Sequence, residues 1–314
     1  MRRLSIAAAA LAFSLGVAAQ QPAPSLPPNV ARPDALTLRA AQRMQQGDVR
    51  GALEDVNEAL LRDSRHAGAY ALRGSIRMTA GDRAGAIADM SHAIELAPEA
   101  EGVEVVHINR ARMHWLDGRT AEAARDVDRA LFLAPVYPPG LHMRANLKAD
   151  KGDLDGARLD LDRAITLSPK MMSAYNSRAI VHLLAGRLQE ALSDWKTAMW
   201  SMPRDADAVA GHGIARGLLG ETAPAMEDLV RARLMDPLSV YPGDRGAASS
   251  PAHRLEQYRE MNPTDGRAVL MGAMIRALNG DVERARQEVD RALQVDPSLR
   301  ADAELVRRHL SAPR

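Results

Sequence analysis

The sequence contains no cysteine and few aromatic residues. Without cysteine, the chain of 314 residues forms no disulfide, has no thiol chemistry and offers no cysteine to a lipid anchor. Aromatic residues make up 3% of the chain, and only four of its 41 basic residues are lysines. The formal net charge is +1, and no basic stripe of the kind that binds nucleic acid is present. Hydrophobic residues nevertheless reach 46%, which is ample for a stable core.

No motif for catalysis or metal binding stands out. The chain lacks a glycine-rich phosphate loop, a nucleophile elbow and a catalytic dyad. The acidic stretch Lys151–Asp162 lacks the full spacing and the closing glutamate of a calcium loop. The nine histidines do not fall at a metal-ligand spacing with a supporting carboxylate. We therefore expect no catalytic residue, no metal and no cofactor.

The first 32 residues are typical of an exported protein. Residues 1–19 have a basic start, an apolar run and small residues before Gln20, which is the pattern of a secretory signal peptide. The apolar run is shorter than the ~20 residues of a spanning helix, so we expect cleavage and no membrane span afterwards. Residues 20–32 are rich in proline and are interpreted as a disordered tether. The expected location is the periplasm, with secretion as the alternative.

A unit of 34 residues recurs between residues 33 and 299. Its second copy, Ala67–Pro98, has one apolar face before Gly81 and another after it, which predicts two short helices joined at a left-handed glycine. The hinge glycine recurs as Gly47, Gly81, Gly118, Gly152, Gly186, Gly220 and Gly280. Two alanines recur in the second helix, the first as Ala52, Ala86, Ala123, Ala157, Ala191, Ala225 and Ala285. The second recurs as Ala59, Ala93, Ala130, Ala164, Ala198, Ala232 and Ala292, and small residues at fixed positions let helices approach closely.

The period and the pattern together resemble the tetratricopeptide repeat family, whose unit is a helix-turn-helix of about 34 residues. The large aromatic residue expected at the fourth position survives only as Tyr70 and Tyr175. The resemblance implies an all-α fold, a right-handed α-solenoid of about seven helical hairpins with a C-terminal capping helix. It also implies a concave surface that binds a protein or a peptide.

The repeat phase divides the chain after the tether into four segments. Residues 33–239 hold the first six repeats, and residues 266–299 hold the seventh. Residues 240–265 break the phase, and we interpret them as a worn half-repeat with one helix over residues 252–261. A mobile flap around Tyr241–Pro251 is the alternative. Residues 299–314 are expected to form a capping helix, with Ser298 as its N-cap, and a short tail.

Oppositely charged residues recur sixteen positions apart within the repeats. An arginine at the seventh position and an aspartate at the twenty-third can meet between the two helices of a hairpin. The pairs include Arg73 with Asp89, Arg110 with Asp126, Arg144 with Asp160, and Arg178 with Asp194. We interpret them as a structural ladder, and an arginine track for an anionic ligand is the alternative.

Several polar residues stand at the positions that face the concave surface in tetratricopeptide repeats. Carried over position by position, these candidate groove residues are Asn109, Arg112, Trp115, His142, Asn146 and Asn176. Asparagine is a poor helix former, and its amide can both donate to and accept from a peptide backbone. The carboxylate-clamp pattern of the chaperone-binding members is absent, since Ala71 and Ser75 stand where lysine and asparagine are needed. An ordinary solvated helix surface is the alternative.

These observations favour a non-catalytic scaffold or adaptor of the bacterial cell envelope that binds a protein or peptide partner in its groove. A carbohydrate-binding or cell-wall-associated module is one alternative, for which Trp115 is the groove's aromatic residue. An accessory subunit of an envelope enzyme complex is another. An enzyme would need the stretch around Tyr241–Pro251 and His253 as its lid.

Overall fold

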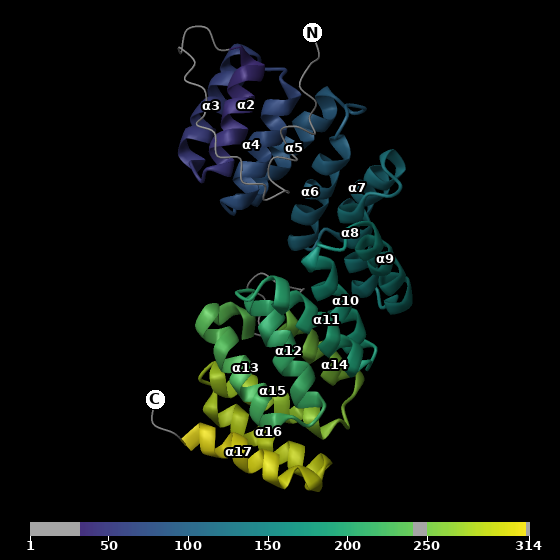
Figure 1. Ribbon diagram of the computed structural model, residues 1–314, viewed down its shortest axis with the longest axis vertical. Helices are drawn as coiled ribbons and strands as arrows, with labels where there is room; N and C mark the ends of the chain where they lie inside the picture. Colours follow the sequence, from purple (N-terminus) through teal and green to yellow (C-terminus); the bar gives the residue numbers. More distant parts are fainter. Residues whose placement is uncertain (1–31, 241–249, 312–314) are drawn as a thin grey trace. The chain divides into compact units, whose positions relative to one another are not determined.

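The computed structural model describes residues 32–240 and 250–311. The signal peptide and all but the last residue of the tether therefore lie outside the described residues, as do residues 241–249 of the alternative flap and residues 312–314 of the tail. Within the described ranges the regular structure is helical and contains no strand (Figure 1). The predicted all-α fold of the solenoid type is confirmed.

Fourteen of the α-helices pair into seven hairpins. The first four hairpins are α2 (Pro33–Gln45) with α3 (Val49–Arg62), α4 (Ala67–Thr79) with α5 (Arg83–Leu96), α6 (Val103–Leu116) with α7 (Thr120–Leu133), and α8 (Pro138–Asp150) with α9 (Leu154–Leu167). The others are α10 (Met172–Leu184) with α11 (Leu188–Ser201), α12 (Ala206–Leu218) with α13 (Thr222–Met235), and α15 (Gly266–Leu278) with α16 (Val282–Val295). Two helices stand outside this pattern, α14 (Pro251–Met261) and α17 (Arg300–Ser311), and two short 3-10 helices cover Pro237–Val240 and Pro297–Leu299.

Each hairpin turns at the predicted glycine. The seven hinge glycines have φ between 71° and 93°, a left-handed conformation that L side chains rarely adopt. In four hairpins the next residue is an aspartate whose carboxylate accepts a hydrogen bond from the first turn of the second helix: Asp48, Asp82, Asp153 and Asp281. Asp153, in the acidic stretch Lys151–Asp162, is thus an N-cap.

The recurring alanines all lie at the helix contacts. All fourteen are fully buried, with 0% of their surface exposed. A larger side chain at any of these positions would push neighbouring helices apart, because interiors are packed without spare volume. The alanines therefore fix the distance between the helices of each hairpin.

The contacts divide the chain into two compact units, one ending at Met143 and the other beginning at Arg144, within α8. In the first unit, α2 to α5 pack side by side (Figure 1): α2, α3 and α4 surround a core that contains Leu36, Leu72 and Ile76, and α4, α5 and α6 surround a second one that contains Met90. In the second unit, the core continues from α10 through α17 and contains Trp195.

The phase break contains a single helix, α14, in the second unit. It begins at Pro251, one residue before the predicted start, because proline suits the first turn and the Ser250 hydroxyl accepts from the His253 backbone N–H. The α14 helix packs against α10, α12 and α15. Its Arg254 is almost fully buried and donates to Asp150 on α8 at 2.6 Å. This helix therefore packs beside the hairpins, while α12 and α15 of the sixth and seventh hairpins contact each other directly.

The last helix begins differently from the prediction. The expectation that Ser298 caps it is wrong, because Ser298 lies in a 3-10 turn. Its backbone N–H and its hydroxyl both donate to the carboxylate of Asp296, at 3.0 and 2.6 Å. The α17 helix then begins at Arg300 and buries Ala303 and Val306.

Candidate functional site

The structure brings the ladder pairs together inside the hairpins. In five hairpins the Nε and Nη2 atoms of the arginine donate to the two carboxylate oxygens of the aspartate at 2.6–2.9 Å. The pairs are Arg39 with Asp55, Arg73 with Asp89, Arg110 with Asp126, Arg144 with Asp160, and Arg178 with Asp194. In the sixth hairpin, His212 replaces the arginine and lies 2.8 Å from Asp228. The five arginine–aspartate pairs have the bidentate geometry that gives strong charge-assisted bonds.

Most ladder aspartates have a second cationic partner that the sequence analysis did not single out. Lys148 donates to Asp160 at 2.8 Å and Arg77 to Asp89 at 2.8 Å. Burial raises the pKa of Asp160, but its hydrogen bonds from Arg144 and Lys148 outweigh burial, so the pKa is lowered overall. The sequence does contain a sign of these second partners. A basic residue recurs at the eleventh position of the repeats, as Arg43, Arg77, His114, Lys148, His182, Arg216 and Arg276.

The seventh hairpin is completed by a residue from outside the repeats. Its seventh position is Gly272, which has no side chain to pair with Glu288 at the twenty-third position. Arg259 of α14 lies there instead and donates to Glu288 at 2.7 Å. A Cβ atom on Gly272 would lie 2.2 Å from Nη1 of Arg259, so the glycine provides the room for this guanidinium.

The ladder arginines are occupied by buried carboxylates and are half-buried themselves. The carboxylate side chains of their five partners are 3–8% exposed. An anionic ligand would have to displace these carboxylates, which favours the structural interpretation over an arginine track. The structural role of the ladder stays a prediction.

Three of the candidate groove residues lie on α6, in the first unit. Arg112 is exposed, and its Nη2 atom lies 2.9 Å from Sδ of Met78 on α4. Asn109 is partly buried. Trp115 is only 9% exposed, so its indole packs into the protein and leaves little surface for a partner. Arg112 is therefore the most accessible of the three.

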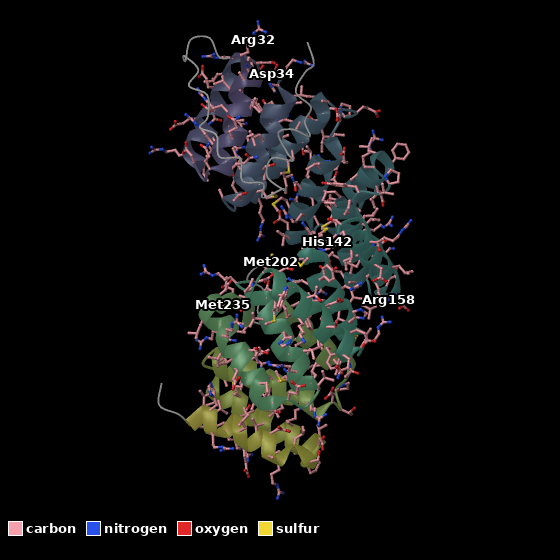
Figure 2. The ribbon with its side chains drawn as sticks, in the orientation of Figure 1. Arg32, Asp34, His142, Arg158, Met202 and Met235 are labelled. Atoms are coloured by element: carbon pink, nitrogen blue, oxygen red, sulfur yellow. The ribbon has the colours of Figure 1, made fainter. Side chains whose placement is uncertain are left out.

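His142 lies on α8 in the same unit (Figure 2). Burial, with the positive charge of Arg112 as the second cause, lowers the pKa of His142 to about 4. Its imidazole is therefore neutral at pH 7. Within the described ranges Arg112 forms no ion pair with a carboxylate, unlike the ladder arginines. This part of the first unit thus presents an uncompensated positive charge beside a neutral imidazole.

The other two candidates belong to the second unit. Asn146 lies on α8, partly buried. Asn176 lies on α10, where its amide nitrogen donates to Asp205 at 2.9 Å. Asp205 is the N-cap of α12, so Asn176 links two successive hairpins. The Oδ1 atom of Asn176 is buried and has no hydrogen-bond partner among the described residues.

Two further features are absent from the described part of the chain, a metal site and a membrane-spanning helix. No group of three histidine, aspartate or glutamate side chains there is arranged to hold a metal ion. Likewise, the helices of residues 32–240 and 250–311 are too short and too polar to cross a bilayer.

The fold and the repeated hairpins define a helical repeat protein. A family model for the tetratricopeptide repeat matches residues 38–101 and 142–198, and with the seven phased hairpins it shows a tetratricopeptide repeat protein. No curated protein sequence matches the chain. Arrays of this fold generally serve as non-catalytic scaffolds for contacts between proteins.

Solved structures of low sequence identity share the fold. One is a tetratricopeptide repeat protein from Parabacteroides merdae, with a TM-score of 0.53 and 18% identity, covering 89% of this chain and 99% of that one. Another is PilW, a type IV pilus biogenesis factor, with a TM-score of 0.56 and 20% identity over 65% of this chain and 94% of that one. A third is the APC/C hetero-tetramer Cut9-Hcn1, with a TM-score of 0.53 and 16% identity over 88% of this chain and 56% of that one.

Proposed function

We propose that this protein is a non-catalytic adaptor of the bacterial cell envelope and that the face of α6 around Arg112 binds a segment of a partner protein. The export part of the proposal rests on residues 1–19, whose basic start, apolar run and small residues follow the pattern of a signal peptide. The binding part rests on the repeat fold, which lines a surface with the first helices of successive hairpins.

The observation that carries the proposal is the contrast between Arg112 and the ladder arginines. Arg73 and Arg110 each bond both oxygens of a buried aspartate. Arg112 is exposed and contacts the soft sulfur of Met78, at 2.9 Å, in place of a carboxylate. A guanidinium in this position can donate to the carboxylate of an acidic side chain of a partner. Binding would give it the charge-assisted bonds that it lacks.

His142 adds a second polar group to the same surface. Because burial lowers its pKa to about 4, its imidazole is neutral at pH 7 and contributes a polar group. The neutral form also adds no positive charge beside Arg112. The two residues together suit an extended segment that carries an acidic side chain.

The test is an in-cell crosslinking pull-down with the full chain and two double variants. The first variant, Arg112→Ala with His142→Ala, removes both groups from the proposed surface. The control, Arg125→Ala with His92→Ala, removes the same residue types from second helices, where their side chains are 76% and 59% exposed. Unchanged helicity of both variants is verified by circular dichroism.

We expect the wild-type chain and the control to capture the same partner, and the first variant to lose it. Capture of that partner by all three proteins would place the contact elsewhere. If no protein is captured by the wild-type chain, the adaptor function itself is wrong, and the cell-wall-associated alternative is then tested with glycan arrays.

A further inference from the structure

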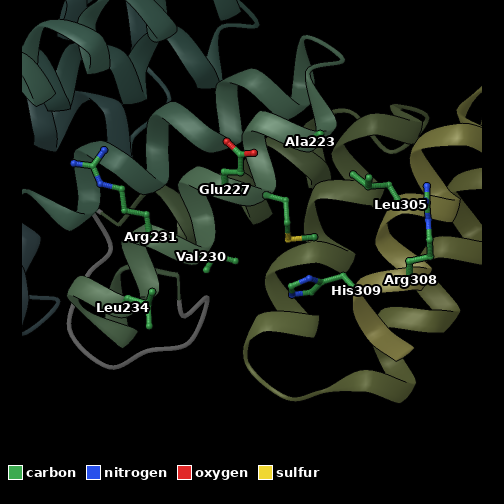
Figure 3. A pocket seen from close by; sticks show the side chains of 9 residues that line it. Ala223, Glu227, Val230, Arg231, Leu234, Leu305, Arg308 and His309 are labelled. Carbon is green, nitrogen blue, oxygen red and sulfur yellow. The ribbon is translucent and has the colours of Figure 1, made fainter. Parts of the chain in front are cut away.

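A second surface lies in the second unit. It is an apolar groove of about 720 Å³ between α13 and α17. Figure 3 shows Val230 and Leu234 of α13 on one side and Leu305 and His309 of α17 on the other. Met226 also lines the groove, so α13 contributes apolar side chains at positions i, i+4 and i+8.

Exposed apolar side chains stand on two successive hairpins of this unit. Leu234 is 83% exposed, and Trp200, at the same position of the preceding repeat, is 89% exposed. Arg231 donates to the backbone oxygen of Pro203 at 3.3 Å, which ties α13 to the segment just after Trp200. Large apolar side chains held in water are costly, and a contiguous patch of them marks an interaction surface.

The repeat fold itself does not require an apolar residue at this position. The equivalent residues are Glu95, Thr166 and Gln294 in three other repeats, and Leu61 and Phe132 in the remaining two. Leu61 and Phe132 are exposed as well, so exposure at this position alone does not mark a binding surface; Leu234 differs because it lines an apolar groove. Leu61, in the first unit, has the same repeat position and the same exposure of 83% as Leu234, so it provides a matched control.

The rim of the groove carries mostly positive charge. It consists of Arg231 and Arg308, with His309 and one acidic residue, Glu227. The side chains of Arg308 and His309 are exposed and form no hydrogen bond or ion pair within the described ranges. A partner with acidic side chains at the edges of its apolar face would complement this rim.

We propose that the groove between α13 and α17 binds an amphipathic helix of a partner protein, with apolar side chains on one face and acidic side chains along its flanks. Two helices form the walls, and one of them, α13, offers apolar side chains at helical spacing, as in helix-in-groove recognition. The inference is independent of the surface around Arg112, because the two surfaces belong to different units.

The experiment uses two synthetic helical peptides of about 18 residues, or ~5 turns. Both carry leucines along one face; the flanks are glutamates in one peptide and lysines in the other. Binding is measured by fluorescence anisotropy with the full chain and three variants: Leu234→Glu in the groove, Arg308→Glu on its rim, and Leu61→Glu as the control. Because all three side chains are exposed, the variants are expected to fold.

We expect the glutamate peptide to bind the wild-type chain and Leu61→Glu equally. Leu234→Glu and Arg308→Glu should each weaken it about tenfold or more, which corresponds to ~1.4 kcal/mol. The lysine peptide should bind more weakly than the glutamate peptide to the wild-type chain, and Arg308→Glu should reduce that preference. The proposal is overturned if the wild-type chain binds both peptides equally or binds neither. It is also overturned if Leu234→Glu binds the glutamate peptide as tightly as the wild-type chain does. A concentration-dependent dimer that Leu234→Glu abolishes would also overturn it, in favour of a second copy of the chain.

Discussion

The guanidinium of Arg259 fills the space that Gly272 leaves open. A Cβ atom at residue 272 would lie 2.2 Å from Nη1 and 2.6 Å from Cζ of this arginine. Arg259 is held there by Glu256, at 2.9 Å, and by Glu288, at 2.7 Å, and its side chain is only 10% exposed. The α14 helix thus supplies the cation that the seventh hairpin lacks at its seventh position, beside its own Arg276, which lies 3.1 Å from Glu288.

We predict that Gly272→Ala destabilises the second unit by about 1–3 kcal/mol, because the new methyl group overpacks an arginine that is anchored at both sides. The measurement is chemical denaturation of the single variants and of the double variant with Arg259→Ala. When Arg259 is absent, Gly272→Ala should be neutral or stabilising, since alanine is the better helix former by ~1 kcal/mol. The same cost in both backgrounds would show that the two residues do not compete for this space.

The structural role of the ladder is tested at Asp160. Its carboxylate is 4% exposed and bonds both Arg144 and Lys148. We predict that Asp160→Ala lowers the free energy of unfolding by about 3 kcal/mol, the low end for a broken buried pair, because both cations can still reach water. The control is Asp155→Ala on the same helix, where the side chain is 83% exposed and little change is expected. An unchanged melting curve for Asp160→Ala would contradict the ladder.

The buried histidines should lower the stability of the chain on mild acidification, whereas Asp207, whose pKa burial raises to about 6, acts in the opposite direction because its folded carboxyl is protonated first. Burial lowers the pKa of His142 to about 4, with Arg112 as the second cause, and burial also lowers the pKa values of His114 and His182. An unfolded histidine titrates near ~6.5, so the unfolded chain binds these protons first. The stability that these neutral, buried histidines contribute is therefore fully present above that pH. It is lost as the pH falls from there toward the folded-state pKa.

For His142 the expected loss is on the order of 1 kcal/mol between about pH 6.5 and 5.5. Thermal unfolding at several pH values measures it, and His142→Ala should show a smaller dependence on pH than the wild-type chain. NMR titration of the imidazole gives a direct reading, and Arg112→Ala should raise the pKa of His142. A pKa near the ordinary value in the folded wild-type chain would contradict this account.

Much of the fold could be predicted from the sequence, because its determinants are local and periodic. A glycine such as Gly81 must end a helix wherever a left-handed turn is needed, and an alanine such as Ala86 recurs wherever two helices touch. The basic residues at the eleventh position, Lys148 among them, were visible in the same period, but only the structure shows that they share the ladder carboxylates.

Other features depend on contacts that no repeat period contains. Arg259 lies on α14, outside the repeats, and reaches the seventh hairpin only through packing. Trp115 stands at a groove-facing position by its repeat number, yet a large indole gains more from burial than from facing water. The division between the two units, between Met143 and Arg144, falls within the first helix of an unbroken repeat. The sequence therefore offered no sign of it.

The central claim, that the face of α6 around Arg112 binds a partner, is tested most directly by site-specific photocrosslinking in the cell. A photoreactive amino acid replaces Asn109 in one chain and the exposed Arg125 of α7 in another. We predict a discrete adduct with one partner from residue 109, and its loss when Arg112→Glu is added. Adducts from residue 125 alone, or an adduct from residue 109 that survives Arg112→Glu, would contradict the claim.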